Sequence, residues 1–118
     1  MEPEELFGGH PAGRRLFQRV CKLMDPIGPM ELRVTKSQVA FRRKKGFAWV
    51  WMPEMYLKRK AAPLVLTIGL HRRDPSQRWK QVIEPYPGRF IHHLELYSEQ
   101  DLDEEVQAVL AEAWELAG

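Results

Sequence analysis

The chain has 118 residues, 44% of them hydrophobic and 29% charged, so it is long enough for one globular core and too short for two ordinary domains. The net charge of only +2 and the high hydrophobic fraction exclude wholesale disorder. The longest apolar run, Leu64 to Leu70, is far shorter than the roughly 20 residues that span a bilayer, which excludes a membrane-spanning protein. We therefore expect a single domain over residues 1–118, with residues 1–10 as a flexible or short helical segment.

The N-terminus and the cysteine content indicate a compartment. The first five residues, MEPEE, are acidic where a secretory signal would be basic, and the single Cys21 cannot form an internal disulfide. Both features favour a cytoplasmic protein.

Apolar residues at helical spacing predict a helix from Pro11 to about Met24, which two prolines and a glycine within residues 26–29 then end. Alternating, β-branched and aromatic residues predict strands further along the chain. These ranges are Met30 to Thr35, Gln38 to Arg43, Phe47 to Met52, Leu64 to His71 and Phe90 to Tyr97, with the short apolar piece Trp79 to Ile83 as a sixth candidate.

The C-terminal segment predicts a second helix that begins at Ser98. The Ser98 hydroxyl can act as an N-cap, and Asp101 follows three residues later as in a capping box. The order helix, strands, helix predicts an α+β fold, in which an antiparallel sheet of five or six strands carries the N-terminal and C-terminal helices on one face.

Four short motifs resemble a small bacterial family of domains of unknown function. They are Thr35-Lys36-Ser37 before a strand, Phe47-Ala48 after a hairpin, Arg89 with His92 and His93, and the segment Ser98 to Asp103 that opens the last helix. The resemblance covers about residues 14–114. It implies an α+β accessory or binding domain without an assigned active site. Similar domains occur alone or beside nuclease-like modules, and some are labelled predicted transport proteins.

The charges are distributed unevenly along the chain. All 18 Lys and Arg lie between Arg14 and Arg89 with only five acidic residues, so this segment carries a net charge of +13. Residues 1–13 carry −3 and residues 90–118 carry −8. A segment as basic as the central one attracts polyanions unless the acidic C-terminal segment folds across it.

The hairpin between residues 42 and 51 combines cations with aromatic residues, as sites that stack bases and neutralise phosphates do. A loop of two or four residues would place Phe47, Trp49 and Trp51 on the same face as Arg42, as an exposed platform. A three-residue loop ending at Gly46, as a bulge in the left-handed region, would place the same three residues in the core. Because Gly46 stands where that turn needs positive φ, we favour the core interpretation.

Three basic clusters follow predicted strands, and we expect them to form a phosphate-binding edge of the sheet. They are Arg42, Arg43, Lys44 and Lys45; Lys58, Arg59 and Lys60; and Arg72 and Arg73. Together with Trp49 and Trp51 they are the candidate nucleic-acid-binding residues. An alternative is a protein-interaction or homo-oligomerisation module, in which the acidic helix of one chain meets the basic sheet edge of another.

A further alternative is a small-molecule pocket between the sheet and the helices, lined by His71, Arg89, His93 and Tyr97. Strand parity places His92 in the core and His93 outward beside Glu95. Because neighbouring strand residues point to opposite faces, these two histidines cannot easily bind one ion, and no Cys or carboxylate spacing completes a site. We expect neither a metal nor a cofactor.

No catalytic constellation is apparent. Cys21 lies near the apolar stripe of the first helix, and no base stands beside a nucleophile. We therefore expect a non-enzymatic binding or accessory domain that contacts nucleic acid through a basic sheet edge.

Overall fold

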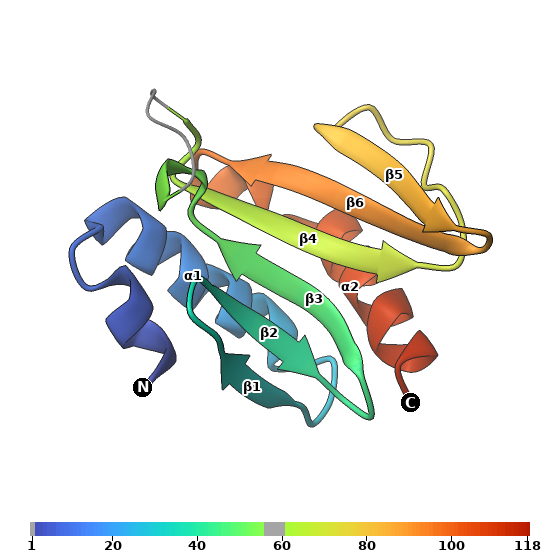
Figure 1. The fold of residues 1–118 in the computed structure, drawn as a ribbon, viewed down its shortest axis with the longest axis horizontal. Helices are drawn as coiled ribbons and strands as arrows, with labels where there is room; N and C mark the ends of the chain where they lie inside the picture. Colours follow the sequence, from blue (N-terminus) through green and yellow to red (C-terminus); the bar gives the residue numbers. More distant parts are fainter. Residues whose placement is uncertain (1, 56–60) are drawn as a thin grey trace.

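The computed structural model describes residues 2–55 and 61–118, which contain one six-stranded sheet and two α-helices (Figure 1). The α-helices are α1 (Pro11–Met24) and α2 (Glu104–Leu116). The strands are β1 (Glu31–Val34), β2 (Gln38–Arg42), β3 (Gly46–Trp51), β4 (Leu64–Leu70), β5 (Gln81–Tyr86) and β6 (Arg89–Leu96). Short 3-10 helices occupy Pro3–Phe7, Pro53–Met55 and Glu99–Asp101.

The strands follow the order β1-β2-β3-β4-β6-β5, and each neighbouring pair is antiparallel. Both helices lie on the same side of the sheet, behind it in Figure 1. The predicted α+β fold is therefore confirmed, with six strands. No helix among the described residues is long and apolar enough to cross a membrane.

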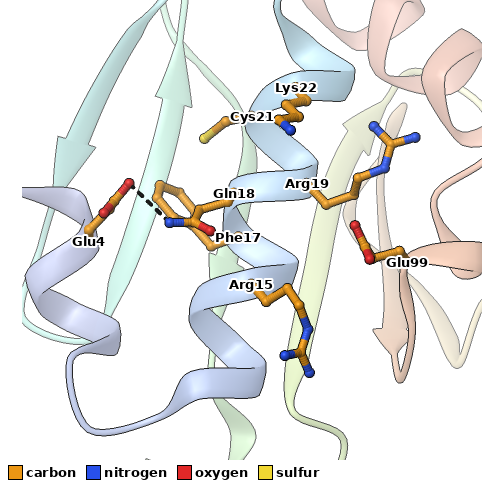
Figure 2. A pocket seen from close by; sticks show the side chains of 8 residues that line it. All are labelled: Glu4, Arg15, Phe17, Gln18, Arg19, Cys21, Lys22 and Glu99. Carbon is orange, nitrogen blue, oxygen red and sulfur yellow. Dashed lines mark hydrogen bonds between the residues drawn. The ribbon is translucent and has the colours of Figure 1, made fainter.

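Helix α1 begins and ends where the sequence predicts. The Nδ1 atom of His10 accepts a hydrogen bond from the backbone N–H of Gly13, and Pro11 occupies the first turn, where its missing N–H costs nothing. The apolar stripe is buried, and it includes Leu16, Phe17 and Val20. Arg15 is exposed and Arg19 is half-buried on one side of the helix, whereas Cys21 lies on the other side and is partly buried against the core (Figure 2).

The N-cap of helix α2 lies five residues later than predicted, at Asp103 instead of Ser98. Ser98 and Asp101 do form a capping box, but it closes the short 3-10 helix Glu99–Asp101. The backbone of Leu102 is not helical, so the α-helix needs a second N-cap. Asp103 provides it, because its carboxylate accepts the backbone N–H of Val106 at 3.1 Å.

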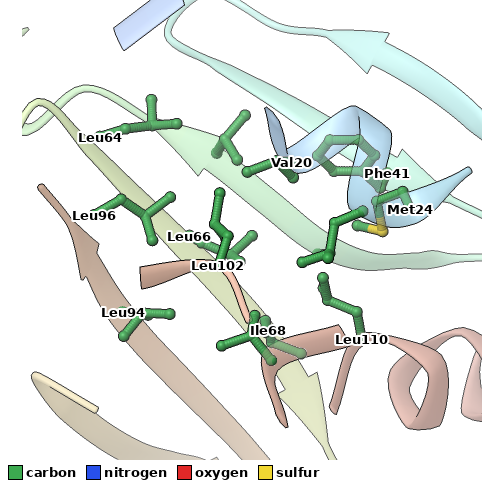
Figure 3. Close-up of a cluster of buried hydrophobic side chains, with 14 of the residues drawn as sticks. Val20, Met24, Phe41, Leu64, Leu66, Ile68, Leu94, Leu96, Leu102 and Leu110 are labelled. Atoms are coloured by element: carbon green, nitrogen blue, oxygen red, sulfur yellow. The ribbon is translucent and has the colours of Figure 1, made fainter. Parts of the chain in front are cut away.

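The hydrophobic core lies between the sheet and the two helices (Figure 3). On β4 the even-numbered residues Leu64, Leu66, Ile68 and Leu70 are fully buried and form the centre of this layer, as predicted. Val20 and Met24 from α1 and Val106 and Leu110 from α2 cover them. Burial of side chains of this size contributes about 1.5–3 kcal/mol each.

Strand β5 starts later than the predicted range, so Trp79 lies before it, in the segment that follows β4. His92 is fully buried, as predicted, and it fixes this segment because its Nε2 atom accepts the backbone N–H of Asp74 at 3.0 Å. The Asp74 carboxylate accepts the indole N–H of Trp79 at 2.8 Å. β5 runs on through Pro85, which an edge strand tolerates.

Candidate nucleic-acid interface

The sheet has one face that no helix of the described residues covers. Because the even-numbered residues of β4 point to the helices, the odd-numbered residues belong to the opposite face, and so do their cross-strand partners. We call this the open face. In sheet order it includes Glu31, Arg33, Gln38, Ala40, Arg42, Trp49, Trp51, Val65, Thr67, Gly69, Arg89, Ile91, His93, Glu95, Gln81 and Ile83.

The β2–β3 hairpin places two tryptophans on the open face, and the core interpretation of Trp49 and Trp51 is wrong. The register pairs Arg42 with Gly46 but Phe41 with Ala48, so Phe47 is an extra residue in β3. This bulge turns Phe47 into the core, where it is 1% exposed, and leaves the two tryptophans on the other face, partly exposed. The expected left-handed conformation of Gly46 is also absent, since only Gly28 and Gly88 have positive φ among the described residues.

Thr67 connects two rings of the open face. Its Oγ1 atom accepts the indole N–H of Trp51 at 2.9 Å and lies 2.8 Å from Nδ1 of His93. The two rings are nearly perpendicular, with centroids 6.2 Å apart. Burial lowers the pKa of His93, and the neighbouring His92 adds to this effect, so His93 is neutral at pH 7.

Two glycines allow large planar groups to lie against the open face. A Cβ atom on Gly46 would stand 3.0 Å from the indole of Trp49, and one on Gly69 would stand 2.8 Å from the guanidinium of Arg89. The Arg89 guanidinium carbon lies 5.9 Å from the centre of the Trp49 ring, within the range of a cation–π contact. Trp49 and Arg89 therefore form an aromatic and cationic pair close to the sheet.

Cations gather at one end of the sheet. Because Ala48 pairs with Ile68 and Leu70 with Phe90, the β2–β3 loop, the end of β4 and the start of β6 share this end. The basic residues placed here are Arg42, Arg43, Lys44, Lys45, Arg73 and Arg89. Among the described residues, no carboxylate lies within 4.0 Å of any of their charged nitrogens. Arg43 instead stacks on Trp114, with its guanidinium carbon 3.6 Å from the ring centre.

Arg72 differs from these cations because two carboxylates bind it. Its guanidinium contacts Glu112 of α2 at 2.8 Å and Asp74 at 3.1 Å, and these hydrogen bonds raise its pKa. Arg78 is bound in the same way by Asp103 and Glu105. The acidic C-terminal segment thus neutralises part of the basic segment within one chain. The third predicted cluster, Lys58, Arg59 and Lys60, lies outside the described residues.

The four residues of the expected small-molecule pocket do not meet between the sheet and the helices. Arg89 and His93 belong to the open face, and His71 is exposed after the end of β4. Tyr97 follows the opposite end of β6 and is 62% exposed. The space between the layers is filled by the apolar core.

A surface hollow beside α1 brings no catalytic group together. Its lining includes Glu4, Arg15, Cys21 and Glu99, which lie on different sides of the helix (Figure 2). Burial, together with the charges of Asp25 and Glu4, raises the pKa of Cys21 to about 11. This thiol is therefore a poor nucleophile at neutral pH.

A family model described as "Domain of unknown function (DUF5655)" matches residues 4–117, which is nearly the whole chain. The chain belongs to this family. Comparisons with curated proteins and with solved structures give no match. The match confirms the resemblance to a family of unknown function that the sequence motifs indicated, and it assigns no chemistry to the open face.

Sequence reasoning did not identify Thr67, Gly46 or Gly69 as parts of this site. Thr67 and Gly69 interrupt the apolar run of β4, and their spacing of two residues is the signal that both belong to one face. Which face lacks helices became clear only from the packing of α1 and α2.

Proposed function

We propose that this domain binds single-stranded nucleic acid across its open face. The observation that carries the proposal is the pairing of partly exposed Trp49 with Arg89 on a sheet face that no described helix covers. An aromatic ring in this setting stacks on an unpaired base of any sequence, and a guanidinium beside it attracts the backbone phosphates.

The arrangement of charge supports a position for the nucleic-acid strand on the open face. Cations without a described acidic partner gather at the end of the sheet that holds the β2–β3 loop and the start of β6. Phosphates bound there would place the adjoining bases over Trp49 and toward the centre of the open face. A duplex fits less well, because its bases are already stacked and unavailable to the ring.

A fluorescence titration tests the proposal. The four tryptophans report binding of a single strand of about 12 nucleotides, a length within the usual site size of such domains, and of the matching duplex. We expect the single strand to bind more tightly, with affinity that falls between about 50 and 200 mM salt. Trp49→Ala should weaken binding by about 5- to 150-fold, the loss of one base–aromatic stack.

Two substitutions provide matched controls. Tyr97→Ala removes an exposed aromatic ring at the other end of β6, and Arg15→Ala removes an exposed cation of α1. Both should leave the affinity within about twofold, since substitutions away from the site change free energies by only about 0.5 kcal/mol. Absence of binding at low salt, or losses with the two controls as large as that with Trp49→Ala, would refute the proposal.

A further inference from the structure

We propose that His93 reads the bases of the bound strand by donating its Nε2–H to a carbonyl oxygen of an unpaired base, such as thymine or uracil. This inference rests on the proposed function, because it concerns a ligand that lies on the open face. It adds a specificity-determining residue and a preferred class of base.

The hydrogen bonds around Thr67 favour one of the two neutral tautomers of His93. The indole N–H of Trp51 can only donate, so Thr67 Oγ1 is the acceptor in that contact, at 2.9 Å. Thr67 Oγ1 has two lone pairs and can accept from both rings, but among the described residues its own proton has no acceptor other than Nδ1 of His93, at 2.8 Å. We therefore assign Nδ1 as the acceptor, the arrangement in which the Thr67 hydroxyl both accepts and donates, and this assignment puts the proton of neutral His93 on Nε2.

The Nε2 atom of His93 is available to a ligand. His93 is only partly buried, and within the described part of the chain its Nε2 atom makes no hydrogen bond. His93 on β6 pairs with Thr67 on β4, and Thr67 pairs in turn with Trp49 on β3. The imidazole of His93 is therefore two strands away from Trp49, at the same level along the strands. At a strand spacing of about 4.8 Å, a base stacked on Trp49 and its neighbour fall within reach of His93.

The neutral donor favours a carbonyl group. An uncharged imidazole gains little from a phosphate, whereas its N–H matches the acceptor oxygens of thymine, uracil and guanine. Adenine has no carbonyl oxygen, and cytosine has only one, so thymine and uracil, which have two each and no amino group, match this donor best. Thr67 is the positioning residue, because it holds the tautomer and anchors the Trp51 ring.

A base analogue separates the hydrogen bond between His93 and the base from the stacking of bases on Trp49. We would compare an oligothymidine of about 12 nucleotides with the same strand carrying difluorotoluene, which keeps the shape of thymine without its strong acceptors. The intact protein should bind the thymine strand about 2- to 10-fold more tightly, as expected for one hydrogen bond. His93→Phe should bind both strands equally, at the affinity that the intact protein shows for the analogue.

Two further variants control for folding and geometry. In His93→Gln the amide nitrogen can replace Nε2, so the preference for thymine should persist; in His93→Asn it can replace only Nδ1, and the preference should disappear. Retention of the preference by His93→Phe or His93→Asn would overturn the inference, and equal binding of both strands by the intact protein would do the same. In those cases a loss with Trp49→Ala would still support the proposed function, whereas no binding of either strand would remove both.

Discussion

The guanidinium of Arg89 lies directly above Gly69, where it fills the volume that a side chain on that residue would need. A Cβ atom built on Gly69 would stand 2.8 Å from three atoms of the guanidinium. Because this group is the far end of a flexible side chain, it can move away at small cost to the fold. The absence of a side chain at Gly69 therefore matters for the position of Arg89 more than for stability.

Gly69→Ala should displace Arg89 from Trp49 without unfolding the sheet. We expect the melting temperature to change little and the affinity for single strands to fall as far as it does in Arg89→Ala. The control is Gly9→Ala, since a Cβ atom at Gly9 meets nothing within 4 Å. Thermal unfolding together with a titration of each variant checks this prediction, and an affinity unchanged from the native protein would contradict it.

Stability should fall as the pH drops below about 6.5, the ordinary pKa of histidine. Burial lowers the pKa of His92, whose Nε2 atom accepts the Asp74 N–H, and burial lowers the pKa of His93 as well. The unfolded chain then binds protons that the folded chain does not, so the free energy of unfolding decreases from pH 6.5 down to the folded pKa values.

Urea unfolding across this pH range measures the effect. The slope should be smaller in His92→Gln, because glutamine has no group that titrates there and can still accept the Asp74 N–H. A slope in His92→Gln equal to that of the native protein would show that His92 is not the buried neutral group.

Asp103 should stabilise helix α2 in two separable ways. Its carboxylate caps the helix, and its pairing with Arg78 at 2.7 Å contributes most to lowering its pKa to about 2. Asp103→Ala should lower the free energy of unfolding by about 0.5–2 kcal/mol, the usual value of an N-cap. Asp103→Asn keeps the cap and removes the charge, so it should lose less.

The Asp103 pairing also has a pH signature. Because the folded pKa lies below the ordinary value of 3.8, its contribution is complete above about pH 4 and disappears as the pH falls through 2. Glu104→Ala is the control, since Glu104 is exposed and has no charged partner in the described segments. Equal losses in Asp103→Ala and Glu104→Ala would contradict the assignment.

Cys21 should react slowly with alkylating reagents while the protein is folded. Its pKa of about 11 compares with 9.0 for an unperturbed thiol, so at pH 8 the thiolate is about 100-fold less abundant than in the unfolded chain. Iodoacetamide labelling with and without urea, followed by mass spectrometry, measures the ratio. Equal rates in the two conditions would show that the thiol is not shielded.

The fold was largely predictable because its signals are local. Alternation of apolar residues in β4 identified the face that packs on the helices, and the parity of β6 placed His92 on that side and His93 on the other. The start of α2 was missed because two capping signals, Ser98 and Asp103, stand five residues apart, and only the backbone of Leu102 shows that the first belongs to a separate turn.

The site was less predictable because it depends on one inserted residue and on distant partners. The bulge at Phe47 reverses which face of the sheet each later residue of β3 points to. In the sequence, Gly46 is equally compatible with a different turn. Arg72 was expected at a phosphate, but its partner Glu112 lies 40 residues away, and no sequence pattern joins the two. Tertiary packing decided both outcomes.

The most direct test of the central claim is a map of backbone amide chemical shifts during titration with an oligothymidine. Binding across the open face predicts shifts concentrated in β3, β4 and β6, around Trp49, Thr67 and His93, with little change along α1 near Arg15 and Arg19. Shifts concentrated on α1, with β3 and β6 unaffected, would show that the ligand binds the helical side and would contradict the account.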